Sequence, residues 1–137
     1  MQPLQEENVT AHYDEEKELV YIIYFGILGS EASTAAYAWL EDLINDVGVD
    51  AIRGEIFDFT QVTQFRPDNL INARRHSKML NLRTDTENMP VAMIVKDMVQ
   101  EEILRGPMRN VPENKRKRIV HSEDEAYAFI DEFHDKQ

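Results

Sequence analysis

The sequence contains no cysteine, and this absence removes several kinds of chemistry. Disulfides, zinc–thiolate sites, iron–sulfur clusters and a cysteine nucleophile are all excluded. The sequence also has no basic start followed by an apolar run, so it predicts no signal peptide. Its apolar stretches fall well short of the roughly 20 residues that a membrane helix needs. We therefore expect a cytoplasmic protein without a membrane span.

Basic residues are scarce in the first third of the chain. Residues 1–50 contain 11 acids and a single base, Lys17, whereas residues 51–137 contain 15 acids and 14 bases. The formal net charge of −11 argues against sequence-independent nucleic-acid binding, which depends on neutralising phosphates. The acidic third is either a solubilising face or one side of a contact between subunits. Together with Tyr37 and Trp39, apolar residues outside the expected helical stripe, the second alternative predicts a homo-oligomer.

The length and composition of the chain are typical of one folded domain. A length of 137 residues, with 42% apolar and 30% charged residues, fits a single domain that spans residues 1–137. Apolar periodicity predicts five strands and four helices in the order ββαβαβαβα. The strands are expected at residues 8–13, 19–25, 52–59, 91–95 and 115–120, and the helix starts near Ser30 or Ser33, at Pro67, at Asp97 and at Ser122.

This order predicts an α/β fold: an N-terminal β-hairpin followed by three strand–helix units. We expect a mixed, mostly parallel five-stranded sheet with its first strand antiparallel near one edge. Gly54, inside the third strand, indicates close packing or a bulge. Asp97 with Gln100 and Ser122 with Glu125 are expected capping boxes. Inward positions are predicted at residues 70, 71, 73, 77 and 80 of the second helix and at 99, 103 and 104 of the third.

Ligands of open parallel sheets bind beyond the carboxyl ends of the strands, and this rim carries no evident catalytic motif. The four histidines lack the spacing of a helical metal site, so no metal site is predicted. The segment Gly26–Ser30 lacks the lysine of a phosphate loop and the third glycine of a dinucleotide fingerprint. We expect no cofactor and no catalytic residues.

Two features of the rim remain as candidate sites. The first is the end of the third strand and the start of the second helix, where Asp58, Phe65, Arg66, Asp68 and Asn69 could form a ligand or partner surface. Asp68 could equally satisfy the free backbone donors of the helix start.

The second candidate is a basic patch. It comprises Arg105, Arg109, Lys115, Arg116, Lys117 and Arg118. These residues either guard a sheet edge or form an anion site or docking patch for the acidic N-terminal third. The methionines at 79, 89, 93, 98 and 108 either fill the core or line an adaptable pocket.

The hairpin, the strand–helix units and the stretch Asp58-Phe59-Thr60-Gln61-Val62-Thr63-Gln64-Phe65 together resemble the anti-sigma-factor antagonist (STAS, SpoIIAA-like) superfamily. The closing segment from Ser122 resembles the final capped helix of that superfamily. The resemblance implies a SpoIIAA-like fold and a non-enzymatic module that binds a partner or a small ligand. It places Asp68 at or next to the serine that is phosphorylated in the best-known members. Because no hydroxyl lies between Gln64 and Ile71, their phosphorylation switch is not expected.

Three functions follow as hypotheses. The first is a regulatory or interaction module without catalysis. The second is a carrier of a small apolar or acidic ligand, held between the second helix, the third helix and the sheet. The third is an enzyme assembled from distant residues, with Asp58, His121 and an arginine in one polar cleft.

Overall fold

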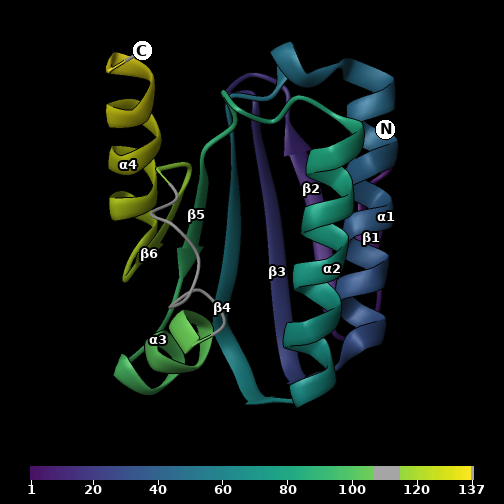
Figure 1. Ribbon diagram of the computed structural model, residues 1–137, viewed down its shortest axis with the longest axis vertical. Coiled ribbons are helices and arrows are strands. Elements are labelled where there is room, and N and C mark those ends of the chain that lie inside the picture. Colours follow the sequence, from purple (N-terminus) through teal and green to yellow (C-terminus); the bar gives the residue numbers. More distant parts are fainter. Residues whose placement is uncertain (107–114, 137) are drawn as a thin grey trace.

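The computed structural model describes residues 1–106 and 115–136, and these contain six strands in one sheet (Figure 1). The strand order follows the sequence, β1-β2-β3-β4-β5-β6. Strands β1 to β3 pair antiparallel, and β3 to β6 pair parallel. Their bounds are β1 (Leu4–Gln5), β2 (Val9–Asp14), β3 (Leu19–Leu28), β4 (Gly54–Phe65), β5 (Val91–Ile94) and β6 (Lys117–Val120).

The prediction of five strands was wrong, because β1 adds a sixth. This two-residue strand pairs with β2, with Leu4 opposite Ala11, and it becomes the edge of the sheet. Two residues are too few to show a period-2 pattern, so the sequence gives no sign of the strand. The α/β class and the mixed, mostly parallel sheet are confirmed.

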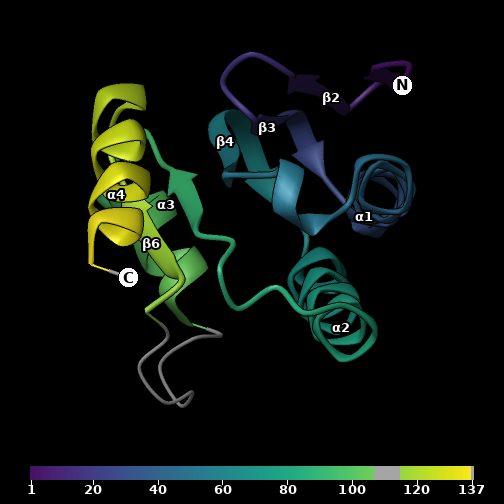
Figure 2. The same cartoon turned by 90° about the horizontal axis from the view of Figure 1, so that it is seen from above.

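Four α-helices pack on the two faces of the sheet in the described part of the chain. They are α1 (Ser30–Val47), α2 (Pro67–Arg83), α3 (Met98–Arg105) and α4 (Glu123–Asp135), and a short 3-10 helix, η1 (Val49–Ala51), follows α1. With strands in sequence order, right-handed crossovers put α1, α2 and α3 on one face. Leu40 of α1 and Leu104 of α3 accordingly belong to one core, and Phe129 of α4 belongs to the other. Figure 2 shows α1 and α2 side by side and α4 apart from them.

Local capping residues fix the starts of α3 and α4 as predicted. Asp97 accepts a hydrogen bond from the backbone N–H of Gln100 at 2.9 Å, and Ser122 accepts one from Glu125 at 3.1 Å. The expected caps of α1 were wrong, because Gly29 is the N-cap and Ser30 is already helical.

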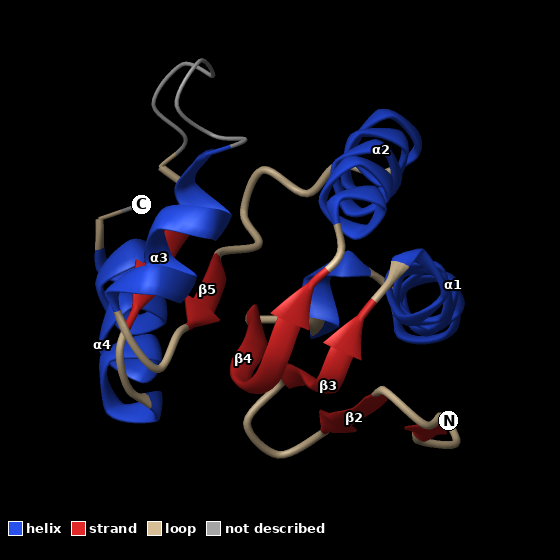
Figure 3. Cartoon of the chain, turned by 90° about the horizontal axis from the view of Figure 1, so that it is seen from below, coloured by secondary structure: helices blue, strands red, loops and turns tan. Residues whose placement is uncertain are grey.

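Strand β4 is longer than the sequence pattern predicts. Residues 60–66 were expected to be a loop, yet β4 continues to Phe65 because it pairs with the equally extended β3. Its pairing with β5 ends where Asp58 lies opposite Ile94. Among the described residues, residues 59–65 of β4 therefore have a strand partner on one edge and none on the other, and Figure 3 shows the ends of β3 and β4 side by side, leading into α1 and α2.

Two further expectations about packing are settled by the structure. A Cβ atom on Gly54 would lie 2.9 Å from Cδ1 of Ile130, so the predicted close packing at this glycine is confirmed. Trp39 is 7% exposed and donates from Nε1 to the carbonyl of Gln2 at 2.9 Å. Trp39 therefore contributes to this chain's own core, and the argument for an oligomer that rested on its exposure was wrong.

Candidate functional site

The predicted site at the end of β4 is held together by local contacts. Oδ1 of Asp58 accepts hydrogen bonds from the backbone N–H of Thr60 at 2.8 Å and from its hydroxyl at 2.7 Å. The ring of Phe65 packs on Phe59, with the centroids 5.9 Å apart. Both side chains thus have structural partners within the strand itself.

At the start of α2, two of the remaining predicted residues are exposed to solvent and the third is buried. Arg66 and Asp68 are exposed, and neither side chain caps the helix. Asn69 is only 3% exposed, and its Oδ1 accepts no hydrogen bond from the described residues. Burying an unpaired acceptor costs about 1–3 kcal/mol. Asn69 also lines a cavity of the protein.

This cavity lies between α2 and α3 and over strands β4, β5 and β6. Its volume is about 820 Å³, within the range of pockets that enclose small organic ligands. The residues that line it come from α1, α2, α3 and four strands. Its position agrees with the second hypothesis from the sequence, a ligand held between the second helix, the third helix and the sheet.

The register of the parallel strands explains the floor of the cavity. Glu55, Val91 and Lys117 are neighbours across β4, β5 and β6, and they form a row toward the amino ends of the strands. The next row is Phe57, Met93 and Ile119. The floor is therefore polar in the first row and apolar in the second.

Aromatic rings make up much of the apolar part of the floor. The rings of Tyr24 and Phe59 stack at 5.3 Å and 27°, and those of Phe57 and Phe59 lie 6.5 Å apart at 13°. Tyr37 leans on Phe57 from α1 with the ring centroids 6.1 Å apart. These rings give the floor an apolar surface, which suits the apolar body of a ligand.

The polar row contains the buried carboxyl group of Glu55. Burial raises the pKa of Glu55 to about 7, while Arg116 and Lys117 act in the opposite direction. Burial also lowers the pKa of both cations. The ammonium group of Lys117 donates to the hydroxyl of Ser77 at 3.0 Å, and this contact joins β6 to α2.

The sequence of α2 explains why a cavity exists. Only Asn69 and Leu80 of this 17-residue helix are buried. The side chains that it turns toward the sheet include Ala73 and Ser77, which are too small to reach the floor. Ile71 was expected to face inward but is 66% exposed. Helix α2 therefore leaves space above β4 and β5.

Polar contacts hold α2 on α1 instead. The amide of Asn72 donates to the carbonyl of Ser30, the hydroxyl of Ser33 and the hydroxyl of Thr34, at 3.0, 2.9 and 2.8 Å. The ring of His76 stacks on Tyr37 with the centroids 5.9 Å apart. These contacts fix the helix beside α1 without drawing it onto the sheet.

The opposite wall, α3, is fixed by the buried side chain of Gln100. Its Nε2 donates to the carbonyls of Phe59 and Val62 at 2.9 and 3.1 Å, and its Oε1 accepts from the backbone N–H of Lys96 at 2.9 Å. The two carbonyls belong to the part of β4 that runs beyond β5. Val99 was expected to face inward but is 69% exposed, so Leu104 is the buried apolar residue of this helix.

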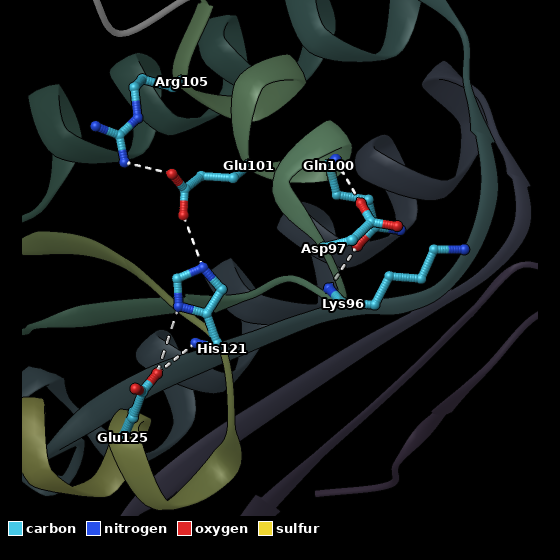
Figure 4. A network of polar contacts seen from close by, with 7 residues as sticks. All are labelled: Lys96, Asp97, Gln100, Glu101, Arg105, His121 and Glu125. Atoms are coloured by element: carbon cyan, nitrogen blue, oxygen red, sulfur yellow. Dashed lines mark hydrogen bonds and ion pairs between the residues drawn. The ribbon is translucent and has the colours of Figure 1, made fainter.

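A second network ties α3 to the start of α4 (Figure 4). Nε2 of His121 lies 2.7 Å from Glu101, whose other oxygen pairs with Arg105 at 3.0 Å. Nδ1 of His121 lies 3.7 Å from Glu125. Both ring nitrogens of His121 thus face carboxylates, whereas the carboxylate of Asp58 binds Thr60. Neither His121 nor Asp58 lines the cavity between α2 and α3.

The predicted basic patch is largely a wall of the cavity. Arg105, Arg116, Lys117 and Arg118 line it, whereas Lys115 is exposed and does not. Arg109 lies outside the described residues, as does Met108. Among the other methionines considered for a pocket, only Met93 lines the cavity.

The residues missed from the sequence are Glu55, Tyr24, Tyr37 and Ser77. A signal was present for Glu55, because it shares the parity of Phe57 and Phe59 along the same strand. The hydroxyl-bearing residues gave no such signal, since they come from three separate elements.

Within the described ranges, no group of three histidine, aspartate or glutamate side chains is placed to hold a metal ion. No described helix combines the length and apolar character that crossing a bilayer requires.

Comparison with known proteins identifies the fold. No family model matches the chain, and no curated protein matches it in sequence. Among solved structures, an uncharacterized protein of the DUF3478 family with a SpoIIAA-like fold, from Shewanella loihica, has a TM-score of 0.60 at 15% identity, covering 95% of this chain and 99% of that one. The unphosphorylated anti-sigma factor antagonist SpoIIAA has a TM-score of 0.54 at 12% identity, covering 88% and 94%.

A third structure, an anti-sigma factor antagonist from Mycobacterium paratuberculosis, has a TM-score of 0.51 at 15% identity and covers 93% of this chain and 99% of its own. The protein is therefore an α/β domain with a large cavity on one face of its sheet. Its fold is SpoIIAA-like, and the resemblance seen in the sequence is confirmed at the level of the fold.

Proposed function

We propose that this protein is a non-enzymatic SpoIIAA-like module that binds one small ligand with an apolar body in the cavity between α2 and α3. The observation that carries the proposal is the cavity of about 820 Å³ with its stacked aromatic floor.

The described lining favours binding over catalysis. It includes one carboxylate, that of Glu55, and no histidine. The raised pKa of Glu55 follows from its burial. Binding needs only the shape and the apolar surface that the cavity provides.

A neutral fluorescent probe tests this function. N-phenyl-1-naphthylamine is aromatic and apolar, and its emission rises when it leaves water. We expect saturable binding by the wild-type chain. Ala73→Trp places an indole in the cavity and should weaken binding at least about tenfold, the loss expected from filling the space that the probe occupies.

Ala38→Trp is the matched control, because Ala38 is an exposed residue of α1 outside the cavity. It should leave binding unchanged. Equal binding by the wild type and Ala73→Trp, with both variants folded by circular dichroism, would show that the probe sits elsewhere and would refute the proposal.

Partner binding at the start of α2 is a second candidate function. It is favoured by the exposure of Arg66 and Asp68 next to the turn from β4. In the resemblance to the anti-sigma-factor antagonists this is the switch region. The two functions are compatible, since the cavity and the exposed turn use different side chains of α2.

A further inference from the structure

The cavity carries a charge opposite to that of the protein as a whole. Its described lining includes six cations, Arg74, Lys78, Arg105, Arg116, Lys117 and Arg118, against one acid, Glu55. The chain has a formal net charge of −11. A concave surface of one sign with low-dielectric walls concentrates ions of the opposite sign. The cavity is thus a positive region in an acidic protein.

Some of these cations are paired with acids outside the cavity. Arg105 binds Glu101 at 3.0 Å, and Arg118 lies 3.7 Å from Glu132 on α4. Lys117 differs, because the hydrogen bond that it makes across the cavity goes to a neutral hydroxyl, that of Ser77. Its ammonium group is also largely buried, and this burial lowers the pKa of Lys117.

Glu55 does not fully balance the cations around it. It lies in the same row as Lys117 but two strands away, which is about 10 Å at the usual strand spacing. Val91 stands between them. Because its pKa is near 7, the carboxyl group carries only part of a negative charge at neutral pH. Lys117 therefore lies at the polar end of the floor without a full counter-charge from Glu55.

We propose that the polar end of the cavity is an anion site, in which Lys117 and Ser77 bind the carboxylate-like group of a monoanion with an apolar body. The apolar body then lies on Phe57, Phe59 and Met93, toward α3. The occupant is an aromatic or otherwise apolar organic acid. This inference rests on the proposed function, because it names the class of ligand for the same cavity.

Two probes that differ in one group test the anion site. 8-Anilinonaphthalene-1-sulfonate is N-phenyl-1-naphthylamine with an added sulfonate, so the pair separates charge from shape. We expect Lys117→Met to weaken binding of the sulfonate probe by about tenfold or more, the loss that follows from removing one charge-assisted hydrogen bond. Binding of the neutral probe should change by less than about twofold.

Two further variants complete the test. Lys117→Arg keeps the charge and should retain the preference for the sulfonate probe. Lys96→Met removes the same charge at a residue that does not line the cavity and should leave both affinities unchanged. Ala73→Trp should abolish binding of both probes, which places them in the cavity.

The outcomes separate this inference from the proposed function. If Lys117→Met binds both probes as the wild type does, the anion site is refuted and the ligand cavity stands. An equal loss for both probes would assign Lys117 a role in cavity shape and would also overturn the anion site. If Ala73→Trp affects neither probe, the proposed function itself fails.

Discussion

Replacing Gln100 by methionine tests how the wall formed by α3 is held in place. Gln100 is 4% exposed, and its amide donates to the carbonyls of Phe59 and Val62. These carbonyls lie in the part of β4 that extends beyond its pairing with β5, so no strand among the described residues replaces the lost donor. Methionine has nearly the same length and volume but cannot donate a hydrogen bond.

The expected loss of stability follows from the two carbonyl acceptors that the substitution leaves unpaired. Leaving a buried carbonyl unpaired costs about 1–3 kcal/mol, so we expect Gln100→Met to lower the free energy of unfolding by about 2–4 kcal/mol. In a domain of this size that corresponds to a decrease in Tm of about 6–15 °C. Because α3 is a wall of the cavity, binding of N-phenyl-1-naphthylamine should weaken as well.

Urea denaturation followed by circular dichroism measures this loss, and calorimetry gives the Tm. Gln64→Met is the control, because Gln64 is an exposed residue of the same strand and its replacement should change stability by less than about 0.5 kcal/mol. A loss below about 1 kcal/mol for Gln100→Met would show that water or a shifted backbone satisfies the two carbonyls. Gln100 would then not be what holds α3 on β4.

Four other predictions follow from the structure. Because the pKa of Glu55 rises from 4.5 to about 7 on folding, its contribution to stability is complete below about pH 4.5 and falls as the pH rises through 7. Denaturation of the wild type and Glu55→Gln from pH 4 to 8 should therefore show up to about 3 kcal/mol more loss in the wild type, and parallel curves would contradict the buried charge. Gly54→Ala should destabilise by about 1–3 kcal/mol, because its Cβ would press on Ile130; unchanged stability would mean that Ile130 can move away. Double substitution of Arg66 and Asp68 by alanine should reduce capture of a native protein partner but leave probe binding intact, and unchanged capture would remove the start of α2 from consideration. Light scattering at low and high salt tests the predicted homo-oligomer, and a monomer at both would refute it.

The sequence predicts those parts of the fold that depend on local chemistry. The caps at Asp97 and Ser122 act within three residues, so reading them needs no knowledge of the tertiary structure. The end of α1 at Gly48 also has a local cause, because the φ of 83° at this residue favours glycine. The short strand β1 and the second half of β4 depend on pairing with distant residues. Their own patterns were too short or too polar to predict a strand.

The candidate site was predictable in its position but not in its composition. One of the three hypotheses from the sequence held a ligand between the second helix, the third helix and the sheet, where the cavity lies, and the predicted basic patch included the basic residues of β6. It could not show that Ala73 and Ser77 leave space, because small inward residues are also compatible with tight packing against the sheet. Which of the two occurs depends on how α2 is anchored, and here Asn72 anchors it to α1.

The attachment of α2 has a consequence for how this protein can diversify. Its fastening to α1 and its lining of the cavity use different sides of one helix, so substitutions on the lining side need not disturb the fastening. Residues 73 and 77 could take larger or differently charged side chains while Asn72 and His76 keep the helix in place. One rigid scaffold can in this way be adapted to new ligands by changing a few positions on a single helix.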